Sequence, residues 1–251
     1  MDKRTFLKSV FLGSTGLFLS SRAYKLKASV SKKKWDGKFI LPELGFAYSA
    51  LTPHMDTKEL HLHHVREHAA YTQQFNTAVK EAGLTGKTAF EILSGASKYS
   101  DTIRNTGGGY LNHKLFWKML TPPRGQQPSR ELMNALTRDF GSFDIFRESF
   151  KQAAISVPSE GWAWLIFSNG RLKVTSTTEN KSPLMDTVSE QGTPLLCLDL
   201  WKHAYAETHQ DDRSAYVRSF WNVVNWDFVS LRYSRNLRKV TRDKGQGTSK
   251  A

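Results

Sequence analysis

The sequence predicts an α+β protein: an N-terminal helical hairpin domain followed by a C-terminal domain with a small three-stranded antiparallel sheet and helices. Apolar residues recur at helical spacing through the first half of the body, without a strand pattern. An Asn-Gly hairpin signal between two apolar runs appears only later, at Asn169. A proline- and glycine-rich stretch near 122–129 separates these two parts of the chain.

Composition narrows the class of protein further. Of the 251 residues, 39% are hydrophobic and 24% are charged, which is typical of a folded soluble chain. No apolar run approaches about 20 residues, which excludes a polytopic membrane protein. Cys197 is the only cysteine, and this excludes an intramolecular disulfide, a CxxC zinc ribbon and an iron–sulfur cluster.

Residues 1–23 are expected to form an export signal peptide. They combine a basic start, an apolar stretch over 10–19 and small residues that suit cleavage after Ala23. The apolar stretch is short for a bilayer span, so an uncleaved anchor is the alternative. The segment from Lys3 to Lys8 resembles a twin-arginine signal with lysine in the first arginine position. We therefore expect a periplasmic or extracellular protein, with the twin-arginine route as one candidate for its export.

Positive charge is concentrated on the two flanks of the chain. The formal net charge is +13, and the body over 35–234 carries as many acids as bases. A nucleic-acid-binding domain normally carries its basic surface on the folded body, so specific nucleic-acid recognition is not expected. We expect a basic linker over 24–38 and a solvated basic tail over 235–251. Adhesion of these flanks to an anionic envelope surface is the alternative role.

The N-terminal domain, over 39–124, is predicted to contain helices only. Asp56 suits the N-cap of its first long helix, and the glycine triplet 107–109 is expected to interrupt the helical pattern. We expect an extended lead-in over 39–51, a long helix from Asp56 to Gly83, and shorter helices over 89–99 and 110–120.

The C-terminal domain, over 125–234, is predicted to mix helices with strands. The Asn169-Gly170 pair favours a tight hairpin between its first two strands, because both residues tolerate positive φ. We expect helices over 130–140 and 144–156, strands over 162–168, 172–177 and 194–200, and helix again over 203–205 and 215–233.

Without a thiol pair, the candidate metal ligands are imidazoles and carboxylates. Asp199 and His203 are four residues apart, so on a helical turn they can share one ion. A capping aspartate beside an unrelated histidine gives the same pattern. His113 lies within an apolar run, where a hydrogen-bonded core histidine is the alternative.

His63 adds a third imidazole. It begins a helical stripe with Glu67 and Tyr71, a pattern that a plain polar helix face also produces. Together with the three candidates above, it gives three imidazoles and one carboxylate. This set suits a divalent or trivalent first-row ion such as manganese or iron, with an open position for water.

Several short motifs follow one another along the body. They are Pro53-His54, Leu62-His63-His64 through Tyr71, NHKLFWK over 112–118, GWAWL over 161–165, SPLM over 182–185, LDLW over 198–201, HAY over 203–205 and FWNVVNW over 220–226. In this order and at these spacings they resemble the iron/manganese superoxide dismutase family from about Leu41 to Tyr233.

The resemblance implies a ligand set and a reaction. The metal ligands would be His63, His113, Asp199 and His203, with water or hydroxide as the fifth ligand. One manganese or iron ion would cycle between its trivalent and divalent states. One superoxide would be oxidised to dioxygen, and the next would be reduced to hydrogen peroxide with two protons.

The resemblance also implies roles around the metal. Tyr71 would help to relay protons at the mouth of the substrate funnel. Trp162 would belong to an aromatic wall that keeps the site dry, although core packing explains such residues equally well. The other members of this wall would be Trp117, Trp164 and Trp201.

Two positions bear on the choice of metal. In manganese members a glutamine from the C-terminal domain usually reaches the bound solvent, and Asn180 occupies the aligned position with a side chain one methylene shorter. Gly109 is the residue typical of manganese members, whereas iron members often carry glutamine there. The sequence therefore favours manganese, with iron as the alternative.

Three departures fall where subunits of the family meet. Lys202 replaces a glutamate, Ala206 replaces a tyrosine and Glu67 replaces a histidine, so both bridges that usually cross the dimer interface are missing. Our hypothesis is a homodimer with an exchanged bridge, in which Glu67 of one subunit pairs with Lys202 of the other. A rearranged interface or a monomer is the alternative.

The sequence thus predicts an exported superoxide dismutase that acts on superoxide. The main alternative is an exported metal-binding relative with weak dismutase activity and an envelope-adhesion role. Metal-dependent oxidation of other substrates through peroxide is a third hypothesis.

Overall fold

The computed structural model describes residues 37–247, with side chains up to Arg242. The expected signal peptide over 1–23 and nearly all of the expected linker over 24–38 lie outside these residues. The described part contains helices first and then a three-stranded antiparallel sheet with further helices, so the predicted fold class is confirmed.

None of the helices within 37–247 combines the length and the apolar character that a bilayer crossing requires.

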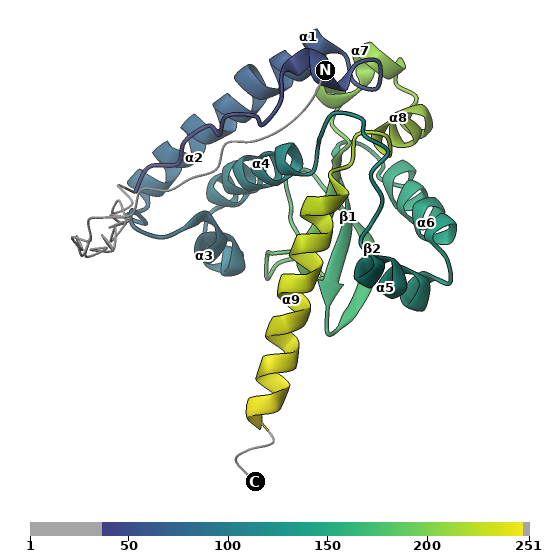
Figure 1. Cartoon of the computed structure of the whole chain (residues 1–251). Helices are drawn as coiled ribbons and strands as arrows, with labels where there is room; N and C mark the ends of the chain where they lie inside the picture. Colours follow the sequence, from purple (N-terminus) through teal and green to yellow (C-terminus); the bar gives the residue numbers. More distant parts are fainter. Residues whose placement is uncertain (1–36, 248–251) are drawn as a thin grey trace, which may run out of the picture. The chain divides into compact units, whose positions relative to one another are not determined.

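The N-terminal domain is built from helices, of which α2 and α4 lie side by side (Figure 1). As predicted, Asp56 caps the first of them, because its side chain accepts hydrogen bonds from the backbone N–H groups of Lys58 and Glu59 at 2.8 and 2.9 Å. The elements are η1 (Tyr48–Leu51), α1 (Thr57–Leu62), the π-helical turn η2 (His63–His68), α2 (Ala69–Glu81), α3 (Ala89–Ser94), η3 (Ala96–Lys98) and α4 (Asp101–Lys118).

The glycine triplet 107–109 does not break the helix, so this prediction is wrong. α4 runs straight through it. Glycine has no Cβ, which lets other parts of the chain approach the helix closely. A Cβ on Gly108 would overlap the carbonyl oxygen of Asn180, and a Cβ on Gly109 would lie 2.5 Å from the Tyr71 ring. The triplet therefore brings α4 against both α2 and the C-terminal domain.

The C-terminal domain contains a sheet with strand order β2-β1-β3, both pairs antiparallel. The predicted hairpin is confirmed: Asn169 and Gly170 have φ values of 51° and 81° and join β1 to β2. The elements are α5 (Arg130–Phe140), α6 (Phe143–Ile155), β1 (Gly161–Ser168), β2 (Arg171–Thr178), β3 (Thr193–Asp199), η4 (Lys202–Ala204), α7 (Ala206–His209), α8 (Arg213–Phe220) and α9 (Trp226–Gly247).

The sheet organises the packing of the whole body. Helix α6 contacts β1 and β2, α5 contacts β2, and α4 and α9 contact β3 (Figure 1). β1 is buried along nearly its whole length, and Trp162 and Trp164 on this strand are fully buried. Because α4 belongs to the N-terminal domain, its contact with β3 places the two domains directly against each other.

The end of the chain differs from the prediction of a single helix over 215–233. Two helices, α8 and α9, are separated by a segment whose backbone pairs with the chain that follows α4. The Thr121 N–H donates to the Val223 carbonyl oxygen at 2.8 Å, and the Asn225 N–H donates to the Met119 carbonyl oxygen at 2.7 Å. These bonds use backbone groups that a continuous helix would need. α9 also continues past the predicted helix end into the predicted basic tail.

Candidate metal centre

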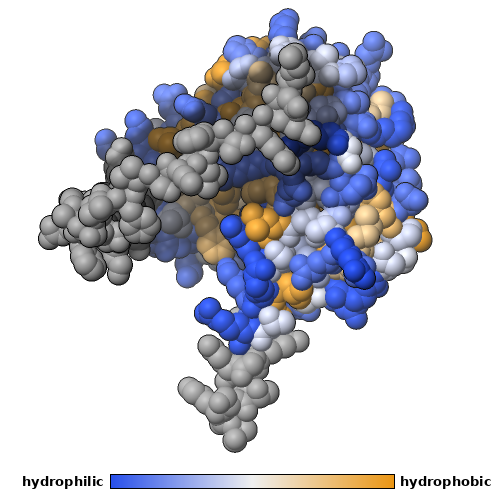
Figure 2. All heavy atoms as spheres, in the orientation of Figure 1, coloured by the Kyte–Doolittle hydropathy of each residue, from blue (hydrophilic) through white to orange (hydrophobic). Residues whose placement is uncertain are grey.

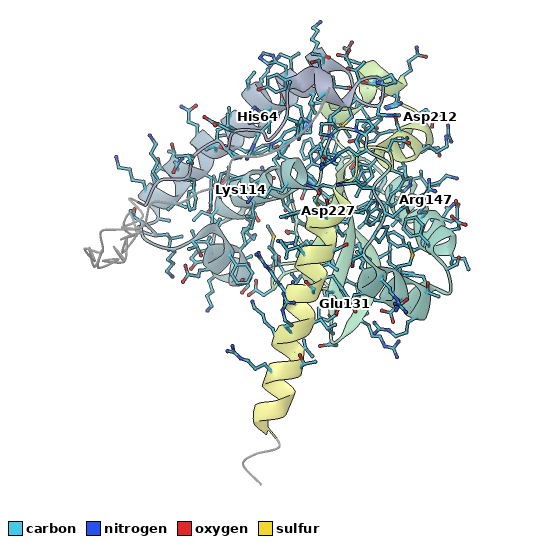
Figure 3. The ribbon with its side chains drawn as sticks, viewed as in Figure 1. His64, Lys114, Glu131, Arg147, Asp212 and Asp227 are labelled. Carbon is cyan, nitrogen blue, oxygen red and sulfur yellow. The ribbon has the colours of Figure 1, made fainter. Side chains whose placement is uncertain are left out.

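Four separate segments bring the predicted ligand residues together. His63 begins η2, His113 lies on α4, Asp199 ends β3 and His203 lies on η4. One ligand atom from each residue lies within 4.8 Å of the other three, and the cluster could hold a metal ion. In Figure 3 the labels of His64 and Lys114 mark the chain neighbours of the first two residues, on adjacent helices. The site therefore exists only when both domains are folded.

The four ligand atoms converge without hydrogen bonding to one another. The Oδ2 atom of Asp199 lies 3.1 Å from Nε2 of His63, 3.3 Å from Nε2 of His113 and 3.6 Å from Nε2 of His203. All four atoms are buried and none has a hydrogen-bond partner among the described residues. Buried polar atoms normally have hydrogen-bond partners, so the convergence of four unpaired ones indicates that they bind a shared ion. Three imidazole nitrogens and one carboxylate oxygen suit manganese or iron.

Burial prepares His63 and His113 in the neutral form that binds metals. It lowers the pKa of His63 to about 4 and holds the pKa of His113 well below its ordinary value. Burial alone would raise the pKa of Asp199, but its contacts with His203 and His63 outweigh this effect and lower that pKa. For His203, burial acts to lower the pKa and the Asp199 carboxylate raises it more. Neutral imidazoles and an ionised carboxylate are the forms that coordinate metals.

Two backbone groups orient the ligand side chains. Nδ1 of His113 lies 2.6 Å from the carbonyl oxygen of Gly109, which can only accept a hydrogen bond. The proton is therefore on Nδ1, and the lone pair of Nε2 faces the cluster. Asp199 accepts a hydrogen bond from the Trp201 N–H through Oδ1 at 2.9 Å, which leaves Oδ2 directed at the imidazoles. Such outer contacts fix the ligands before the ion arrives.

Tryptophan rings surround the imidazoles. Trp117, Trp162 and Trp201 lie with ring centroids 4.6, 5.1 and 5.8 Å from those of His63, His113 and His203, respectively. Trp164 stands one layer further out, because it stacks on Trp162 at 5.8 Å and donates its Nε1–H to Thr177. These rings place apolar surface against the imidazoles, which lowers the local dielectric constant.

Tyr71 and Asn180 lie on the His113 side of the cluster. The half-buried Tyr71 ring is 5.5 Å from that of His113. Burial raises the pKa of Tyr71, and its contact with the Asn180 side chain lowers it. Asn180 is buried, and its Nδ2 donates to Oδ1 of Asn105 at 3.1 Å. Asn180 and Trp201 both line a cavity of about 970 Å³.

Sequence reasoning missed His68. This fully buried residue stacks on His113 with ring centroids 5.4 Å apart, and its Nδ1 accepts a hydrogen bond from Nε1–H of Trp117 at 2.9 Å. Its Nε2 lies 3.1 Å from the carbonyl oxygen of Tyr110. Burial lowers its pKa to about 3. His68 lies five residues after His63, and the π-helical turn η2 between them changes the helical register, which a spacing of 3.6 does not anticipate.

Fold and site together define a metalloprotein whose two domains share one buried ion site for a redox-active first-row metal. Comparisons with known proteins specify the class further. Residues 38–121 match the model described as "Iron/manganese superoxide dismutases, alpha-hairpin domain", and residues 128–232 match the one described as "Iron/manganese superoxide dismutases, C-terminal domain". This chain belongs to the iron/manganese superoxide dismutase family.

Two relatives illustrate the similarity. The chain is 40% identical over 217 residues to "Superoxide dismutase [Mn]" of Acinetobacter baylyi, which covers 85% of this chain and 95% of the relative. It is 39% identical over 204 residues to "Superoxide dismutase [Mn/Fe]" of Methylomonas sp., which covers 79% of this chain and 99% of the relative. The names of these relatives include both manganese and iron.

Proposed function

We propose that this superoxide dismutase works outside the cytoplasm and uses manganese in preference to iron. Family membership and the convergence of the four ligand atoms support the activity itself. The convergence is the main support for dismutase activity, because each of these four atoms is buried without a hydrogen-bond partner among the described residues.

Different residues of the chain have different roles around the ion. A bound manganese or iron ion supplies the one-electron redox chemistry that converts superoxide to dioxygen and hydrogen peroxide. The tryptophan rings exclude water from the site. Tyr71, whose pKa burial raises, keeps its phenol proton at neutral pH at the edge of the cluster. Asn180 contacts Tyr71 and thereby positions that O–H group.

Gly109 supports the preference for manganese. A Cβ at this position would lie 2.5 Å from the Tyr71 ring, so the structure leaves no room for an amide side chain from α4. The amide near the site comes instead from Asn180, in the C-terminal domain. Reconstitution of the purified chain with manganese or iron tests this proposal, and higher activity of the iron form at equal metal content would contradict it.

A superoxide-decay assay on the purified, metal-analysed chain tests the activity. We expect rapid decay with the wild type and a loss of bound metal and of activity in His113→Ala, because one ligand nitrogen is removed. Equal decay rates for the two proteins would show that the cluster is not the catalytic centre.

Residues 1–23 support the proposal of export, since they have the pattern of a signal peptide. An anionic envelope surface would then be the partner of the basic flanks. Fractionation of cells that express the chain with and without these residues tests the location. Recovery of the complete chain in the cytoplasmic fraction alone would contradict it.

We also propose the exchanged bridge between Glu67 and Lys202 of two subunits. Val65, on the turn η2 that also holds Glu67, and Leu62, the last residue of α1, are 41% and 40% exposed, which suits an interface. The Lys202 side chain is 68% exposed and its pair with Asp211, at 3.4 Å, is a surface contact of small energy, so Lys202 is available to a second subunit.

Sedimentation at micromolar concentration tests this bridge. We expect a dimer for the wild type, dissociation for Glu67→Lys or Lys202→Glu alone, and recovery of the dimer when both changes are combined. A monomeric wild type rejects the proposal, as does a dimer that none of these changes weakens.

A further inference from the structure

Helix α9 has two faces of opposite character. One face contributes to the core of the body, where its residues recur every three or four positions. These residues are Trp226, Val229 and Tyr233, which are buried, and Leu237 and Val240, which are partly buried. The opposite face carries four exposed cations at i, i+3, i+4 and i+7. We call Arg235, Arg238, Lys239 and Arg242 the basic stripe. Figure 1 shows α9 extending past the end of the sheet, away from the rest of the body.

Among the side chains that the structure describes, up to Arg242, none pairs with the basic stripe as a counter-ion. Together with Thr241, the four side chains of the stripe line a shallow cavity of about 680 Å³. Arg232, one turn earlier, differs, because it is largely buried and donates to the Pro194 carbonyl oxygen at 2.8 Å. Figure 2 shows hydrophilic side chains around the projecting end of α9.

The helix dipole does not account for this arrangement. Cations stabilise the C-terminal end of a helix, but the effect is confined to about the last turn. α9 ends at Gly247, so Arg235 and Arg238 lie two or more turns before that end. A row of like charges along about 10 Å of helix instead creates a positive field that favours an external anionic partner.

We propose that the basic stripe docks this dismutase on the surface of an anionic phospholipid bilayer. Each Lys or Arg side chain near such a surface strengthens binding by about fivefold, so four together give a factor of several hundred, roughly. The apolar face of α9 is occupied by the core, which leaves electrostatic contact without insertion of the helix. The inference depends on the proposed export in one respect only, because export decides at which membrane the protein meets the bilayer.

The composition of the stripe favours lipid over nucleic acid. Proteins that bind single strands stack bases on aromatic side chains, and the stripe has none. The body over 35–234 carries no net charge to extend a nucleic-acid surface.

Vesicle co-sedimentation of the full manganese-loaded chain tests the proposal, with vesicles of phosphatidylglycerol in phosphatidylcholine and of phosphatidylcholine alone. The stripe variant combines Arg235→Glu, Arg238→Glu and Arg242→Glu. The matched control makes the same change of net charge at exposed residues of other helices, namely Lys58→Glu, Lys80→Glu and Arg130→Glu. All proteins share residues 1–34, so the basic N-terminal flank contributes equally to the binding of each.

We expect the wild type to bind the anionic vesicles in a salt-sensitive manner. The stripe variant should bind at least about a hundredfold more weakly, because it loses three attractive charges and gains three repulsive ones. The control should change by less than tenfold, roughly, because its charges lie outside the stripe. Equal losses in both variants, or no loss in the stripe variant, would overturn the proposal. So would stripe-dependent binding to a DNA oligomer without binding to vesicles. Superoxide-decay rates should stay at the wild-type value in both variants, which separates a failure of docking from a failure of catalysis.

Discussion

His68 illustrates how a single residue supports the metal site without belonging to the ligand set. Its Nδ1 accepts the Trp117 indole proton, so its own proton lies on Nε2 and is donated to the Tyr110 carbonyl oxygen. The pKa of about 3 keeps the ring neutral. Because the ring also stacks on His113, one fixed tautomer holds a ligand and a wall residue in place at once.

We predict that His68→Leu destabilises the protein by about 2 kcal/mol, because the buried Trp117 N–H and Tyr110 carbonyl both lose their partner. Bound metal per chain should fall as well, since His113 loses the ring that it stacks on. Urea unfolding and metal analysis measure these effects, with the exposed His61→Leu as the control. Unchanged stability together with a full metal content would contradict the role of His68.

At the level of residues, the sequence predicted part of the site. The i, i+4 spacing of Asp199 and His203 and the apolar setting of His113 named candidate ligands, and the family resemblance assembled them into one set. His68 was missed because the π-helical turn alters which residues share a face, and that turn has no signature in local sequence. The roles of Tyr71, Asn180 and Trp162 in catalysis stay predictions.

Among the elements of the fold, α4 depends most on the absence of side chains. Its glycines at 107, 108 and 109 would meet Phe75, Asn180 and Tyr71, respectively, if each carried a Cβ. Asn112, one turn further along α4, donates its Nδ2–H to the same Asn180 carbonyl oxygen at 3.2 Å. The close approach therefore allows a hydrogen bond that ties the helix to the C-terminal domain.

We predict that Gly108→Ala destabilises the protein by about 2 kcal/mol or more. Alanine favours a helix by about 1 kcal/mol over glycine, but here its Cβ overlaps a backbone oxygen that cannot move without separating the domains. Gly95→Ala is the matched control, since its Cβ would meet only the flexible Lys98 side chain at 3.6 Å. Chemical denaturation of both variants measures the difference, and a Gly108→Ala protein as stable as the wild type would refute the prediction.

The elements also show where local reasoning fails. Turn chemistry at Asn169 and Gly170 and the cap at Asp56 were predicted correctly, because both depend on adjacent residues. The glycine triplet was predicted to interrupt a helix, because three glycines weaken a helix wherever packing does not compensate. The division between α8 and α9 depends on pairing with the chain after α4, which is contact information that no short window of sequence contains.

For the whole molecule, the metal acts as a link between domains. Two ligands come from the N-terminal helices and two from the segment that begins at the end of β3. An ion that binds only when both parts are folded adds its binding free energy to the stability of the complete fold.

We predict that removal of the metal lowers the Tm by about 10 °C, which corresponds to about 4 kcal/mol for an ion present at a thousandfold excess over its Kd. Reloading with manganese should restore the Tm of the wild type but not that of His113→Ala. Thermal unfolding followed by circular dichroism before and after chelation measures the shift. Equal Tm values for the two forms would mean that the ion does not connect the domains.

The late position of Asp199 and His203 in the chain also sets the order of events during synthesis. A nascent polypeptide that has emerged from the ribosome as far as β1 already presents both imidazoles of the helical half, yet it lacks the carboxylate that faces them. Capture of the ion therefore belongs to the final stage of maturation, after β3 and the turn beyond it have joined the growing structure.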